Sequence, residues 1–113
     1  MTQTTLTREA LLTEIAARTK QVEIKGIGAI TIRSWSPVQR SRRQAAIAKM
    51  NPEEQYKYAA AFAIVDMVRN KDDSPMFTED DISLLIGETS SATKIDLLHG
   101  ACQEFDDEES GNE

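Results

Sequence analysis

A run of seven consecutive apolar residues, Ala59 to Val65, dominates the middle of the sequence. Asn51 and Pro52 precede this run and are typical of a helix start, with a capping residue followed by a first-turn proline. The predicted helix covers residues 52–70. Met67 and Val68 continue the apolar pattern, which only Asp66 interrupts. A helix that is apolar on nearly every side must be buried, and this run is far too short to span a membrane. We therefore predict this helix as the centre of a folded core.

The length of the chain allows one such core. For 113 residues and 12.6 kDa, a folded surface of about 6,200 Å² is expected, and about two thirds of the unfolded surface is buried. We expect a single domain over residues 7–105. Residues 1–6 show no periodic pattern and residues 106–113 contain no apolar side chain, so both segments are predicted to be disordered.

Two segments with alternating apolar residues flank Gly26 and Gly28. Val22 and Ile24 precede the glycines, and Ile30 and Ile32 follow them. This spacing predicts a β-hairpin with one apolar face. A two-stranded hairpin is marginal in water, so that face needs helices, or strands of a neighbouring subunit, packed against it.

Four further helices are predicted from caps and periodicity. Thr7 caps a helix over residues 8–18, which we interpret as an amphipathic lid. Ser36 and Pro37 begin a helix over residues 37–49, Thr78 begins a short helix that ends at Gly87, and Ser90 or Ser91 begins the last one. The predicted fold class is α+β, mainly α, with a small N-terminal β-hairpin packed against about five helices.

Charge is distributed unevenly along the sequence. Residues 1–60 contain 10 Lys/Arg and 5 Asp/Glu, whereas residues 61–113 contain 3 and 14, and the whole chain has a net charge of -6. Nucleic acid is an unexpected partner for such a chain, as is an anionic membrane, because phosphate contacts need a dense cationic surface. A local basic cluster lies beside Trp35 and comprises Arg33, Arg40, Arg42, Arg43 and Lys49. It has three possible interpretations: a solvated helix face, a protein-docking patch or a nucleic-acid site.

Chemistry-bearing residues form no convincing catalytic or metal-binding pattern. Asp96, His99 and Cys102 recur at three-residue spacing, but three positions on one helix provide no second wall and no oxyanion donors. The acidic residues near Asp72 and Glu79 lack the ligand spacing of a calcium loop. We therefore predict a protein that is not an enzyme and has no cofactor and no metal. With one cysteine and no secretory signal pattern, it is expected in a reducing cytoplasm.

The order of segments resembles a known family. Residues 22–24 (VEI) and 30–33 (ITIR) form the hairpin, residues 36–43 (SPVQRSRR) begin one helix, residues 63–68 (AIVDMV) end another, and residues 75–85 (PMFTEDDISLL) and 90–98 (SSATKIDLL) follow. Together they are similar to the tail assembly chaperones of long-tailed bacteriophages over about residues 7–105. Where that family tends to have an aspartate–glycine turn, this chain has Asp73, Ser74 and Pro75.

The resemblance implies a function and partners. Members of this family are generally non-enzymatic, bind the tape-measure protein before the tail tube polymerises around it, and are absent from the finished tail. The resemblance therefore implies that this chain binds and solubilises the tape-measure protein in the cytoplasm of the bacterial host. It also implies that the chain is absent from the mature virion. Further expected partners are a frameshifted long form of the chain itself, the tail-tube protein, and other copies in a weak homo-oligomer.

The sequence also predicts a binding surface and leaves one alternative function open. An amphipathic helix and an aromatic residue beside arginines are typical of protein-docking surfaces, and the residues predicted to bind a partner are Leu11, Ile15, Trp35, Arg40, Arg42 and Arg43. The alternative function is a small acidic regulatory protein of a phage or bacterium that inhibits or recruits a host protein, including a nucleic-acid mimic.

Overall fold

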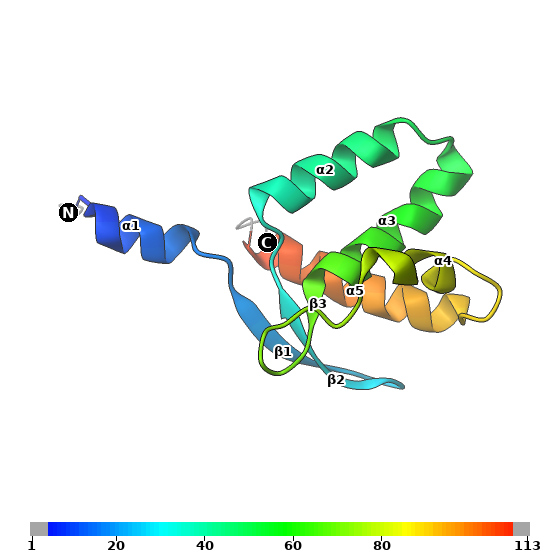
Figure 1. Cartoon of the computed structure of the whole chain (residues 1–113). Coiled ribbons are helices and arrows are strands. Elements are labelled where there is room, and N and C mark those ends of the chain that lie inside the picture. The colour runs from blue at the N-terminus through cyan, green and yellow to red at the C-terminus, as the bar shows by residue number, and fades with distance from the viewer. Residues whose placement is uncertain (1–4, 110–113) are drawn as a thin grey trace.

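The computed structural model describes residues 5–109. Its elements confirm the predicted fold class of α+β, mainly α (Figure 1). In chain order they are α1 (Arg8–Ile15), β1 (Thr19–Ile24), β2 (Gly28–Arg33), α2 (Pro37–Ala48), α3 (Pro52–Met67), β3 (Val68–Arg69), the 3₁₀ helix η1 (Glu79–Asp81), α4 (Ile82–Leu85) and α5 (Ala92–Glu109).

Helix α3 is the most buried element, as the sequence predicts. Every residue from Ala60 to Met67 is buried, including Asp66. The small alanines let α2, α4 and α5 approach α3 closely, and β2 packs at its C-terminal end. The core cluster formed in this way is Ile32, Ala63, Ile64, Met67, Val68, Cys102 and Phe105.

The hairpin gains a third strand that the sequence analysis did not predict. In the β1–β2 pair Val22 lies opposite Ile30. Gly26 lies in the turn and Gly28 begins β2, and both have positive φ. Helix α3 ends at Met67 instead of residue 70 because Val68 pairs with Ile32 as strand β3. A three-stranded antiparallel sheet with one face on the core needs less support than a hairpin alone.

Helix α1 differs most from its prediction. Thr7 caps it, accepting a hydrogen bond from the Ala10 N–H at 3.1 Å, but the helix ends at Ile15 because Ala16 is extended. Among its eight residues, all of them described, none is buried. The predicted lid is therefore wrong: α1 projects away from the helical body as an arm (Figure 1). The accessible surface of 8051 Å² exceeds the roughly 6,200 Å² of a compact chain of this mass.

The C-terminal helix extends beyond residue 105, so the predicted start of disorder at residue 106 is wrong. Helix α5 continues to Glu109, and its last turn is held by ion pairs to basic residues of other elements. Lys20 lies 3.1 Å from Glu108, Arg18 lies 3.9 Å from Glu109, and Arg40 binds Asp106. These pairs offset the unfavourable placement of carboxylates at a helix C-terminus. Residues 110–113, and residues 1–4 at the other end, lie outside the described part of the chain.

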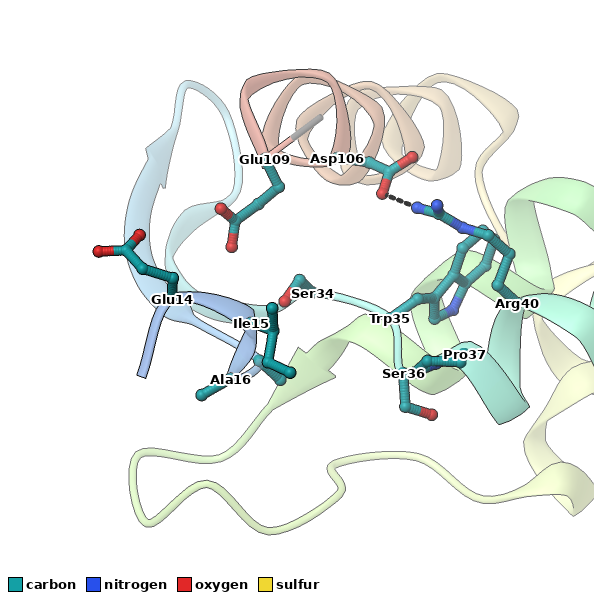
Figure 2. A pocket seen from close by; sticks show the side chains of 11 residues that line it. Glu14, Ile15, Ala16, Ser34, Trp35, Ser36, Pro37, Arg40, Asp106 and Glu109 are labelled. Carbon is teal, nitrogen blue, oxygen red and sulfur yellow. Dashed lines mark hydrogen bonds and ion pairs between the residues drawn. The ribbon is translucent and has the colours of Figure 1, made fainter. Parts of the chain in front are cut away.

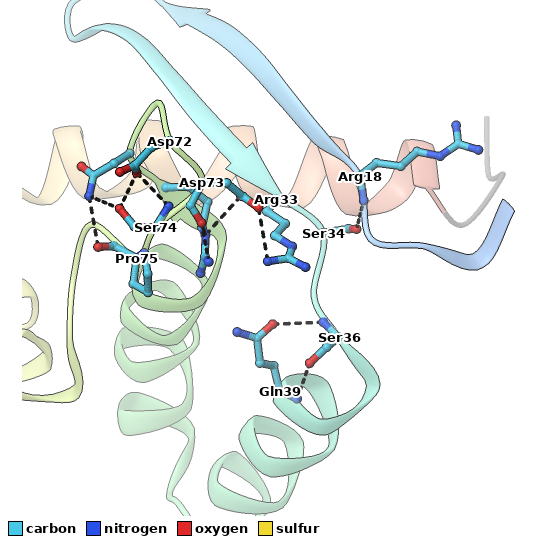
Figure 3. Close-up of polar contacts among 11 residues, drawn as sticks. Arg18, Arg33, Ser34, Ser36, Gln39, Asp72, Asp73, Ser74 and Pro75 are labelled. Carbon is cyan, nitrogen blue, oxygen red and sulfur yellow. Dashed lines mark hydrogen bonds and ion pairs between the residues drawn. The ribbon is translucent and has the colours of Figure 1, made fainter. Parts of the chain in front are cut away.

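The loop after β3 is fixed by polar contacts (Figure 3). The Asn70 backbone N–H donates to the Ser74 carbonyl, and Arg33 pairs with Asp73 at 3.4 Å. Asp73 has a φ of 69°, a left-handed conformation that aspartate tolerates better than most residues. The chain turns at residues 71–73, and Pro75 then forms an isolated bridge with Arg69. Across residues 5–109, helices of the length and apolarity needed to cross a bilayer are not found.

A chain that ends at Phe105 should be less stable than a chain that ends at Glu109. The shorter chain loses the last helical turn and its three exposed ion pairs, each of which contributes about 0.2–1 kcal/mol, so we expect a loss of about 1–2 kcal/mol. Urea denaturation at low and high salt measures the difference, which should shrink as salt screens the pairs. Equal stability of the two chains at low salt would show that the last turn of α5 does not dock.

Candidate protein-binding surface

A hollow of the described surface lies where α1, α5 and the segment before α2 meet (Figure 2). It is an open groove of about 370 Å³ between the end of α1, the segment from Ser34 to Pro37 and the end of α5. A second hollow of about 410 Å³ shares Ile15, Trp35 and Arg40 with it and extends along α2 to Gln44. We call this continuous surface the Trp35 groove.

Local hydrogen bonds position the groove. Ser34 closes the open end of the hairpin: its hydroxyl accepts from the Arg18 N–H at 3.0 Å, and its own N–H donates to the Arg18 carbonyl at 2.9 Å (Figure 3). Ser36 then caps α2: its hydroxyl accepts from the Gln39 N–H, and its own N–H donates to the Gln39 side-chain oxygen. With Pro37 fixing the first turn of α2, the chain leaves the sheet in one defined direction.

The apolar part of the groove is formed by Ile15, Trp35 and Pro37. Ile15 is 68% exposed on the arm, whereas Trp35 is half-buried and packs against the core cluster. Among the described residues, the Trp35 Nε1–H is a buried donor without a hydrogen-bond partner. An unpaired buried donor costs about 1–3 kcal/mol, so the indole is not in its most favourable environment.

The charged part of the groove contains three carboxylates, those of Glu14, Asp106 and Glu109, and one guanidinium, that of Arg40. Arg40 binds Asp106 and lies over the Trp35 ring, 5.9 Å from its centroid (Figure 2). Arg18 lies 3.3 Å from Glu14 and 3.9 Å from Glu109. Both nearby arginines are therefore already engaged by acids, and the groove keeps an excess of negative charge.

The structure brings together three of the six residues predicted to bind a partner. Ile15, Trp35 and Arg40 line the Trp35 groove. Leu11 is exposed on the arm but does not line the groove, and Arg42 is exposed on α2. The prediction is wrong for Arg43, whose residue surface is only 4% exposed.

Arg43 is the centre of a buried ion-pair cluster. Its Nε and Nη2 each donate to an Asp66 carboxylate oxygen at 2.8 Å, its Nη1 donates to Glu79 at 3.2 Å, and the guanidinium lies 4.4 Å from the Phe62 ring centroid. The hydrogen bond with Asp66 raises the pKa of Arg43 above its ordinary value, against the opposing effect of burial. Arg43 therefore stays charged and joins α2, α3 and η1.

Asp96, His99 and Cys102 do not assemble into a reactive set. Asp96 accepts a hydrogen bond from the Tyr56 hydroxyl at 3.1 Å, and burial lowers the pKa of His99. Cys102 is buried in the core, and burial raises its pKa to about 12, which keeps the thiol protonated. Within residues 5–109, groups of three or more His, Cys, Asp or Glu residues that could hold a metal ion are not found.

Sequence reasoning missed Asp106 and Glu109 as groove residues because it placed residues 106–113 in a tail. A signal was present, since Leu98, Cys102, Phe105 and Glu109 continue one helical spacing. The absence of apolar residues after Phe105 outweighed it. An acidic helical turn beside basic residues of other elements needs no apolar side chain to be ordered.

Replacing Arg43 should destabilise the fold strongly. Arg43→Met leaves Asp66 buried without its counter-charge, so we expect a loss of about 3–5 kcal/mol of unfolding free energy. Arg42→Met, at the exposed neighbouring position, is the matched control and should change stability by less than about 0.5 kcal/mol. Equal effects of the two variants in urea denaturation would contradict the buried cluster.

Glu79 should make stability sensitive to acid. Its hydrogen bond with Arg43 lowers the pKa of Glu79 below the ordinary value, and burial opposes this shift. A carboxylate with a lowered pKa in the folded state stabilises the protein above its unfolded pKa, and this contribution is lost as pH falls through the folded pKa. Glu79→Gln should therefore lose less stability than the unmodified chain on acidification, with Asp80→Asn as the exposed control. The measurement is urea denaturation from neutral pH to pH 3, and parallel curves for Glu79→Gln and the unmodified chain would exclude this role.

Comparison with known proteins rests on the fold. Protein-family models and curated protein sequences give no match to this chain. Among solved structures, the chain is similar to the tail assembly chaperone of bacteriophage HK97, with a TM-score of 0.57 and 19% sequence identity. The similarity covers 86% of this chain and 97% of the HK97 chain. The chain therefore has the fold of the HK97 tail assembly chaperone over most of its length.

Proposed function

We propose that this protein is a non-enzymatic tail assembly chaperone of a long-tailed bacteriophage, which binds the tape-measure protein and keeps it soluble during tail assembly. The observation that carries the proposal is the shared fold with the HK97 tail assembly chaperone, which extends over 97% of that chain. The segment order of the sequence supports it independently, since it resembles the same family without any structural information.

The exposed arm supports a role in binding an apolar client. Leu11, Leu12 and Ile15 on α1 are between 45% and 68% exposed, which is unusual for large apolar residues that lie close together. A long helical protein with apolar faces self-associates unless those faces are covered. An amphipathic surface can cover them, and a carrier with a net charge of -6 keeps the complex in solution.

The alternative of an acidic nucleic-acid mimic receives less support. A mimic needs carboxylates spread over its surface in place of phosphates. In this protein Asp106, Glu108 and Glu109 are each within 4 Å of a basic side chain, and Glu79 pairs with Arg43. These acids serve the fold, so their charge is partly neutralised.

The remaining partners follow from the same proposal. A frameshifted long form of the chain and the tail-tube protein are the further assembly partners that we propose. Weak self-association is also proposed, because the two halves of the sequence carry opposite net charge and β1 lies at the edge of the sheet. The site of action is the cytoplasm of the bacterial host, and the protein does not remain in the mature virion.

Co-expression tests the proposed function. The tape-measure protein encoded by the same genome is produced in bacteria with this chain, with an unrelated acidic protein of similar size, or alone. We expect a several-fold larger soluble fraction, and co-purification of the two proteins, only with this chain. An unchanged soluble fraction together with stoichiometric capture of a host enzyme would support the regulatory alternative and contradict the chaperone role.

A further inference from the structure

We infer that the Trp35 groove binds an amphipathic helix whose apolar face is flanked by lysine or arginine residues. The inference deepens the proposed function, because it names the surface and the client chemistry. The sequence left three interpretations of the basic cluster open, and the inference replaces the protein-docking one with a groove in which carboxylates are in excess.

The dimensions of the groove fit a helix. Its two hollows, of about 370 and 410 Å³, adjoin at Trp35 and extend along α2 from Ser36 to Gln44. Those nine residues cover about 12 Å of helix axis, or a little over two turns. A groove of this length accommodates the i, i+4 and i+7 side chains of a partner helix. Ile15 and Trp35 provide the apolar contacts, and the ring of Trp35 is the type of anchor that dominates protein interfaces.

Charge selects a basic partner. The carboxylates of Glu14, Asp106 and Glu109 outnumber the guanidiniums of Arg18 and Arg40, and those arginines are already paired with them. Glu104 adds an exposed carboxylate on the neighbouring face of α5, where Glu108 is paired with Lys20. A lysine or arginine beside the apolar face of a partner would meet this excess, whereas an acidic helix would be repelled.

The same charges disfavour the arm of a second copy as the occupant. Helix α1 carries Arg8, Glu9 and Glu14, so its net charge is negative. It would bring a further acid to an already acidic groove. Because α1 buries none of its residues, it can shift toward a partner without breaking core contacts.

Trp35 is the only tryptophan of the chain, so its fluorescence reports on the groove directly. The probe is a synthetic 18-residue helical peptide without tryptophan, with leucines on one face and lysines beside them, and the comparison peptide has glutamate in place of lysine. We expect a saturable change of Trp35 emission with the lysine peptide, and binding weaker by about tenfold or more with the glutamate peptide.

Two matched pairs of variants test the location. Ile15→Ser should weaken binding by about fivefold or more, whereas Val38→Ser should not, although Val38 is 71% exposed and outside the groove. Glu109→Gln should weaken binding of the lysine peptide more than Glu104→Gln, which lies on another face of α5. All four substitutions are at residues that the core does not bury, and circular dichroism confirms that each variant folds.

Three results would overturn the inference. They are equal binding of the two peptides, equal loss of peptide binding with Ile15→Ser and Val38→Ser, and a concentration-dependent change of Trp35 emission without peptide that places a second copy in the groove.

Failure of the groove inference can be distinguished from failure of the proposed function. If the unmodified chain and Ile15→Ser keep the tape-measure protein equally soluble, the groove is wrong and the function stands. If neither does so while the lysine peptide still binds, the function is wrong and the groove stands.

Discussion

The position of α2 depends on the ion pair between Arg43 and Asp66. Within α2, which is described in full, Arg43 is the one buried residue. Helices usually attach to a core through an apolar stripe, but α2 attaches to α3 through a bidentate guanidinium–carboxylate pair supported by Glu79 and the Phe62 ring. Such a pair fixes distance and rotation more strictly than apolar contacts do. Since α2 forms one wall of the Trp35 groove, the buried pair also determines the shape of the candidate binding surface.

Much of the fold was predictable because its signals are local. The apolar run in α3, the alternation around Gly26 and Gly28, and the caps at Thr7, Ser36 and Asn51 all concern neighbouring residues, and the structure confirms each of them. The third strand was not predictable in this way. Val68 continues the helical pattern of α3, and only the open edge of β2, which is distant in the sequence, draws it into the sheet.

The candidate site was predictable only in part, for an electrostatic reason. A run such as Arg40, Arg42 and Arg43 indicates a basic surface if each residue is considered alone. The structure gives each arginine a different environment: Arg43 is buried with Asp66, Arg40 is bound to Asp106, and Arg42 is exposed. The acids that change the sign of this surface come from α5, more than 60 residues later in the chain. Helix periodicity identifies the faces of one helix, but it does not show which charges of another helix lie opposite.

The isolation of α1 affects the kinetics of any complex that it joins. A helix of eight residues, none of them buried, is marginal in water, because so few residues cannot compensate for nucleation. Its conformation therefore becomes fully populated only against a partner, and the ordering entropy reduces the affinity for a given contact area. Complexes of this kind dissociate more readily than rigid complexes of equal area. In the chaperone function proposed above, the client can then be released without an energy-consuming step, because a competing surface can displace the weakly held arm.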